Sequence, residues 1–109
     1  MLSQGVALGV TLLIEAPIVW FASARSRRGP AWRAAAALLP SCVTHPFAWQ
    51  AIGHFGAHDY LVGLVLIEAL VVLAEAVMVA VLAGLTPRVA LLMSLAANLA
   101  SALLGGLLA

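Results

Sequence analysis

Five polar side chains that can bind a proton or a cation lie within long apolar stretches of this 109-residue chain: Glu15, His45, Glu68, Glu75 and Asn98. Carboxyl and imidazole groups exchange protons, and together they suit a hard or borderline divalent metal ion. Ionisable groups inside apolar segments are costly and are therefore candidates for a functional site. The residue types predict a proton- or cation-binding site, with the three glutamates and His45 as possible metal ligands.

Glu15 and Glu68 stand fifty-three residues apart in the same local sequence, since Leu-Ile-Glu-Ala occurs at 13–16 and again at 66–69. Further polar pairs share this offset: Ser41 with Ser94, and His45 with Asn98. We expect a tandem duplication of a two-helix hairpin. Because two helices per unit preserve orientation, the repeat would be parallel, with a pseudo-twofold axis along the membrane normal. That axis would bring Glu15 and Glu68 toward one another.

The composition excludes an ordinary soluble domain. Hydrophobic residues make up 65% of the chain and charged residues only 8%, whereas soluble domains carry about a quarter charged residues. Continuous runs of Leu, Ala and Val indicate helices rather than membrane β-strands. A spanning helix needs about 20 apolar residues. We therefore predict a single all-α membrane domain over 1–109, with four transmembrane helices at about 2–22, 32–52, 60–83 and 87–108.

The arginines predict the orientation of the chain in the membrane. They surround the first and third connections and are absent from the second, 53–59: Arg25, Arg27, Arg28 and Arg33 at the first, and Arg88 at the third. By the positive-inside rule, loops 23–31 and 84–87 are expected in the cytoplasm and both termini outside. The expected location is a bacterial inner membrane.

The polar residues are predicted to converge inside the helical bundle. A rise of 1.5 Å per residue places all of them within a hydrocarbon core about 30 Å thick. Glu68 and Glu75, seven residues apart, share one helix face. We expect Glu15, His45, Glu68 and Asn98 to point inward within one connected polar network, with other side chains filling the rest of the interior.

A filled interior leaves no solvated pathway, so transport would require a homo-oligomer or a larger membrane complex. Gly5-x-x-x-Gly9 and Ser101-x-x-x-Gly105 are candidate contact surfaces, because small residues let helices approach closely. The lipid bilayer is the other expected partner, and nucleic acid is not expected. Cys42 is the only cysteine, so we expect no internal disulfide and a buried, inert thiol.

Three functions remain open at this level. The first is proton or cation binding, in transport or as a membrane subunit of a larger complex. The second is a membrane-embedded metal-dependent enzyme that uses Glu15, His45, Glu68 and Glu75, although known enzyme and cofactor motifs are absent and the sequence specifies no cofactor. The third is a structural assembly subunit whose polar residues lock the helices together. Glutamine in place of Glu15 or Glu68 separates the first function from the third, because it removes the charge and keeps the shape.

The length, the four predicted helices and Glu15 together resemble the small multidrug resistance transporters. In that family a glutamate of the first helix exchanges protons for cationic drugs at a dimer interface, and the resemblance implies this role for Glu15. The resemblance covers the architecture and this one residue. His45, Glu68, Glu75 and the parallel repeat depart from the family pattern, and we assign no family membership.

Overall fold

The computed structural model describes residues 3–108, with side-chain surroundings for residues 3–104. The architecture is all-helical, as the sequence predicts, and consists of four helices: α1 Gln4–Ala22, α2 Pro30–Ile52, α3 Tyr60–Ala83 and α4 Pro87–Leu108. α2 begins two residues earlier than expected, because a proline at the first helical position loses no hydrogen bond. The expected start of the first helix at residue 2 lies outside the described residues.

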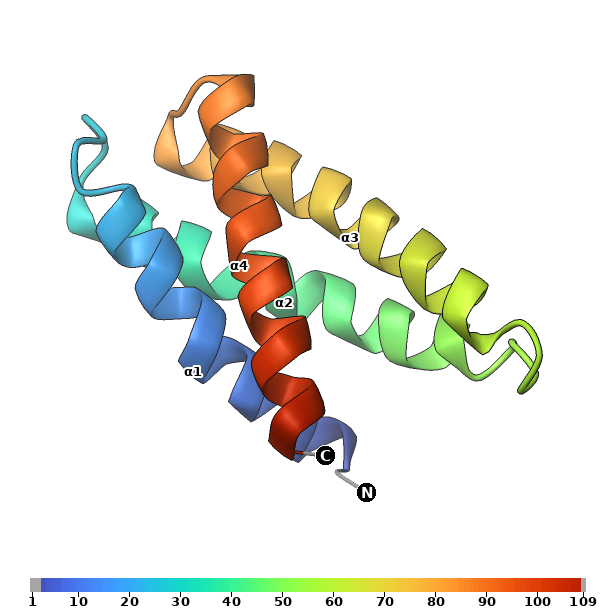
Figure 1. The fold of residues 1–109 in the computed structure, drawn as a ribbon. Coiled ribbons are helices and arrows are strands. Elements are labelled where there is room, and N and C mark those ends of the chain that lie inside the picture. Colours follow the sequence, from blue (N-terminus) through green and yellow to red (C-terminus); the bar gives the residue numbers. More distant parts are fainter. Residues whose placement is uncertain (1–2, 109) are drawn as a thin grey trace.

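The helices form a ring in chain order. α1 contacts α2, α2 contacts α3, α3 contacts α4, and α4 closes the ring against α1. The loops 23–29 and 84–86 lie together at one end, here called the arginine end, and both termini and the loop 53–59 lie toward the other (Figure 1). In Figure 1 the α1 and α4 ribbons draw away from α2 and α3 toward this second end, here called the open end.

Small side chains fill the half of the bundle nearer the arginine end. Ala83 and Ala90 have 0% of their surface exposed, and these two alanines let α3 and α4 approach closely. The core cluster of this half comes from all four helices: Val19, Ala36, Ala37, Val79, Ala83, Ala90, Met93 and Ala97. We refer to this half of the bundle as the arginine half and to the cluster as the small-residue core.

The loops of the arginine end are fastened to the helices beside them. Ser26 Oγ donates a hydrogen bond to the carbonyl of Ala83, which joins the first loop to the end of α3. Gly84 ends α3 with φ 66°, a left-handed conformation that glycine adopts without strain. A Cβ at this position would also lie only 2.9 Å from the Arg28 side chain. The arginine end is therefore a closed cap over the small-residue core.

Three helices, α1, α3 and α4, are long and apolar enough to cross a membrane. α2 is not among them, because Arg33, Ser41, Thr44 and His45 lower its hydropathy. The structure thus supports a membrane protein with three apolar helices.

Candidate functional site

Two buried glutamates from different helices share one serine hydroxyl. Glu15 of α1 and Glu75 of α3 are each only 4% exposed. Ser41 Oγ of α2 lies 2.9 Å from Glu15 Oε1 and 3.3 Å from Glu75 Oε2. A hydroxyl carries a single proton, so Ser41 can donate to only one of the two carboxyls at a time. We call Glu15 and Glu75 the carboxyl pair and Ser41 its bridge.

The two remaining carboxyl oxygens have donors from α4, and Thr44 of α2 is a second donor to Glu75 Oε2. Ser101 Oγ lies 2.5 Å from Glu15 Oε2. Thr44 Oγ1 donates to Glu75 Oε2 at 2.8 Å, and Asn98 Nδ2 donates to Glu75 Oε1 at 2.7 Å. All four helices therefore contribute to one polar cluster, here called the carboxyl network: Glu15, Ser41, Thr44, Glu75, Asn98 and Ser101.

Local helix geometry brings these donors to the carboxyls. Ser41 and Thr44 are three residues apart on α2, and Asn98 and Ser101 are three residues apart on α4, so each pair occupies one helix face. Asn98 Nδ2 is also 2.9 Å from the carbonyl of Ser94 on the preceding turn, which holds the amide toward Glu75. Ser94 Oγ in turn donates to the carbonyl of Val72 at 2.8 Å and ties α4 to α3. The network is thus built on rigid helical positions.

A cavity of about 260 Å³ extends from the carboxyl network toward the open end. It is lined from all four helices, and Ile52 and Tyr60 beside the loop 53–59 line its far part. Its volume is enough for several water molecules. We call it the central cavity. The expectation that side chains fill the shared interior therefore holds for the arginine half alone, because larger, polar and less closely packed side chains line the other half.

On the other side of the carboxyl pair the space almost vanishes. The pocket between the pair and the small-residue core measures about 10 Å³ and is lined by Val19, Ala36 and Val79 among others. This volume is at the lower limit for a single water molecule. The carboxyl pair accordingly lies at the boundary between a close-packed region and a hollow one.

His45 and Glu68 line the central cavity without joining the carboxyl network through a direct hydrogen bond. The His45 ring lies beside Trp49, with ring centroids 5.8 Å apart, and its Nε2 atom is buried without a hydrogen-bond partner among the described residues. Glu68 is half-buried and also borders a groove between α3 and α4. No Lys or Arg of the described chain lines the central cavity, so His45 is the only side chain there that can become positively charged.

The structure brings together some of the sequence-predicted residues and separates others. Glu15, Glu75 and Asn98 are members of the network, whereas His45 and Glu68 are neighbours of it across the central cavity. Thr44 is a network member that the sequence reasoning did not single out. Its position three residues after Ser41, on the same helix face, was the available signal.

A metal centre does not emerge from this geometry. Within the described part of the chain, no group of three or more His, Cys, Asp or Glu side chains converges closely enough to hold a metal ion. The expected burial of Cys42 is wrong: its side chain is exposed on the outside of the bundle, because Ser41 occupies the inward-facing position of that helix turn.

Comparison with known proteins adds no family to this description. No protein-family model, no curated protein and no solved structure matches the chain.

Proposed function

We propose that this chain is an integral membrane protein that binds a proton or a small cation between Glu15 and Glu75, in transport or as a membrane subunit of a larger complex. The observation that carries the proposal is the shared Ser41 hydroxyl, 2.9 Å and 3.3 Å from two buried carboxyls. The central cavity connects this pair to the open end of the bundle.

The site has an empty state and an occupied state, which differ in whether a proton or a cation is bound at the two carboxyls. When both carboxyls are ionised, Ser41 donates its proton to one of them, and two buried negative charges face each other across one hydroxyl. When one carboxyl is protonated, its O–H donates to Ser41 Oγ and the serine proton goes to the other carboxyl. A cation bound between the two carboxylates would balance the same charge. The occupied site, with a proton or a monovalent cation, thus carries one more positive charge than the empty site.

We infer that α2 is a fourth membrane span. Its polar side chains face the interior: Ser41 is buried, and Thr44 and His45 line the central cavity. Its outward positions are apolar and exposed, which suits contact with lipid: Leu38, Leu39, Val43 and Phe47. The low hydropathy of α2 then reflects a polar inner face and three interruptions, Arg33, Pro40 and Pro46, rather than an aqueous surrounding.

We further propose that the arginine end is cytoplasmic, in a bacterial inner membrane, with both termini outside. Single cysteines introduced at Gly29 and Ala57, in a background in which Cys42→Ser removes the exposed native thiol, should react with an impermeant maleimide from opposite sides of the membrane. Reaction of both cysteines from the same side would reject this orientation.

The tandem duplication remains a proposal. It is supported by the closed ring, in which the α1–α2 hairpin contacts the α3–α4 hairpin through both α2 with α3 and α1 with α4.

The closed end of the central cavity limits how an ion could cross the membrane. The central cavity stops at the carboxyl pair, so passage across the membrane would require the small-residue core to open or a second copy to supply a path. A homo-oligomer or a larger complex is therefore one of two routes in the transport proposal, whereas binding needs only one copy.

Glutamine substitution tests the proposal, because Gln keeps the shape of Glu and cannot ionise. We expect Glu15→Gln and Glu75→Gln to fold, to lose proton uptake measured on the purified protein after a pH jump, and to abolish cation-coupled flux in liposomes. Asp59→Asn, outside the cavity lining, is the matched control and should retain both activities. Glu68→Gln tests the repeat-based expectation that Glu68 acts as the equivalent of Glu15. Folded Glu15 and Glu75 variants with unchanged proton uptake would leave the network as a structural lock between helices.

A further inference from the structure

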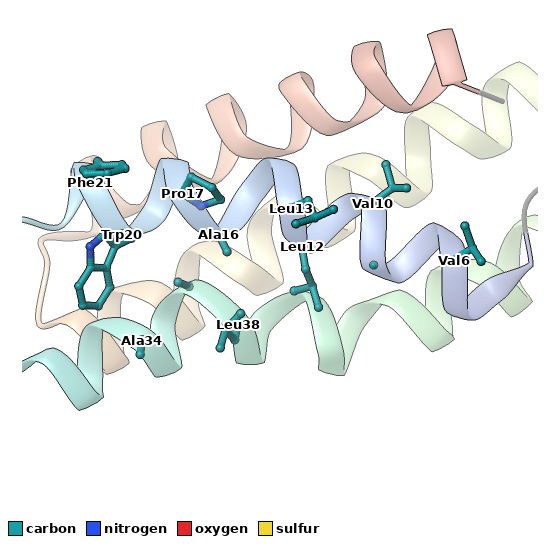
Figure 2. A pocket seen from close by; sticks show the side chains of 12 residues that line it. Val6, Val10, Leu12, Leu13, Ala16, Pro17, Trp20, Phe21, Ala34 and Leu38 are labelled. Atoms are coloured by element: carbon teal, nitrogen blue, oxygen red, sulfur yellow. The ribbon is translucent and has the colours of Figure 1, made fainter.

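A second, larger hollow lies on the outside of the bundle between α1 and α2 (Figure 2). Its volume is about 900 Å³, and its lining is almost entirely apolar, with Leu13, Pro17 and Phe21 from α1 and Leu38 from α2. Gly9 also lines it, and no atom lies within 4 Å of the position that a Cβ would take there, so the space beside Gly9 is free. We call it the α1/α2 groove. It shares no lining residue with the central cavity, so the two are separate hollows.

One end of the groove is marked by a stacked tryptophan and arginine. Trp20 lines the groove, and the guanidinium of Arg33 lies 4.1 Å from the centre of the Trp20 ring. Arg33 donates Nη2–H to the carbonyl of Trp20 at 2.5 Å and Nε–H to Ser23 Oγ at 3.3 Å. A guanidinium has five N–H donors, so these two bonds leave donors for a ligand.

The charge around this end of the groove is positive and has no acidic counterpart nearby. Arg28, in the loop that precedes α2, lies over the Trp32 ring at 5.2 Å, and Arg25 and Arg27 are exposed in the same loop. The acidic side chains lie elsewhere: three glutamates line the central cavity, and Asp59 is in the loop 53–59 toward the open end. The N-terminus of α2 adds the positive end of a helix dipole.

We propose that the α1/α2 groove binds one anionic phospholipid, with its phosphate at Arg33 and one acyl chain along the apolar groove. A guanidinium matches a phosphate through paired N–H donors. Basic pockets between helices on the cytoplasmic side are the usual sites for acidic lipid headgroups. The apolar lining, the arginine beside its end and the uncompensated positive charge together match the two parts of such a lipid.

Charge also favours a lipid over a second copy of the chain. Two copies with the same orientation, paired through their α1 helices, would bring both arginine clusters to the same membrane face. Like charges at that face would repel, whereas an anionic headgroup would neutralise them. The small residues Gly5 and Gly9 nevertheless permit close helix approach, so pairing of two copies is the competing outcome that the experiment must separate.

The test compares thermal unfolding of the purified protein in nanodiscs of phosphatidylcholine alone and with added phosphatidylglycerol. We expect phosphatidylglycerol to raise the midpoint of wild-type unfolding and to remain bound in native mass spectra. Arg33→Gln should remove the shift and weaken the bound lipid at least tenfold. Gly9→Leu, which fills the groove and leaves every arginine in place, should do the same. Arg88→Gln, at the same membrane face on α4 and outside the groove lining, is the control and should retain the shift.

Each other outcome overturns the proposal. An unchanged phosphatidylglycerol shift in folded Arg33→Gln and Gly9→Leu would place acidic-lipid binding elsewhere. Equal stabilisation by both lipids would make the groove an unselective apolar surface. A Gly9→Leu variant that converts a dimer to a monomer, with no lipid dependence in the wild type, would assign the groove to a second copy. Arg33→Lys is the control for misfolding of Arg33→Gln, because it keeps the charge and should retain part of the shift.

Discussion

In the arginine half of the bundle, alanines from three helices pack until Ala83 and Ala90 expose no surface, whereas in the other half the same four helices surround about 260 Å³ of free space. The same four helices run through both halves, but α1 and α4 draw away from α2 and α3 toward the open end (Figure 1). Small apolar residues allow close approach in the arginine half, whereas glutamate, histidine and tryptophan are among the residues that line the space in the other half. The carboxyl pair lies at the boundary between the two kinds of packing, with close packing on one side and the central cavity on the other.

The largest expected effect comes from enlarging a side chain in the close-packed half. Ala83→Leu should lower the free energy of unfolding by about 1–3 kcal/mol, because overpacking forces neighbouring helices to shift. Ala48→Leu makes the same change beside the central cavity, where space is available, and should cost much less. Unfolding in mixed detergent micelles measures both values. Equal losses for the two variants would mean that the cavity half is as tightly packed as the arginine half.

A smaller difference in the free energy of unfolding is expected between alanine variants of the two glutamates of α3. Glu75→Ala removes the acceptor of Thr44 and Asn98 and should destabilise the bundle by about 1–2 kcal/mol. Glu68→Ala removes a half-buried carboxyl that makes no direct network bond, so its unfolding free energy should change little. The same micelle titration compares them. A greater loss from Glu68→Ala than from Glu75→Ala would contradict the assignment of Glu75 to the network.

The smallest expected effect concerns the glycines that end α3 and α2 at opposite ends of the molecule. Gly84 has φ 66° and lies against Arg28, so Gly84→Ala should cost roughly 1 kcal/mol. Gly53 has φ −67°, and a Cβ there makes only ordinary contacts, so Gly53→Ala should be neutral or slightly stabilising. Thermal unfolding of the two variants distinguishes them. Matching midpoints would show that the arginine end is not held in the conformation described.

Residue spacing was a better guide to helix faces than to partners. The seven-residue spacing of Glu68 and Glu75 correctly places both beside the interior, but the internal repeat singled out Glu68 as the counterpart of Glu15. The structure instead pairs Glu15 with Glu75 through Ser41. The two α3 glutamates differ by about 10 Å along the helix axis. Whether Glu68 or Glu75 contacts Glu15 depends on how α1 and α3 are displaced along their axes relative to each other. Local sequence does not specify that displacement.

The sequence by itself determined the four helices, their approximate ends and the apolar character of three of them, because these depend on composition, helix-starting prolines and the spacing of polar residues. Tertiary structure alone decided that the interior divides into a packed and a hollow half, that Thr44 and Ser101 join the carboxyl network, and that Cys42 points outward. Those features depend on how far each helix is rotated and displaced against its neighbours. Many side chains from all four helices set these displacements together, so no local stretch of sequence specifies them.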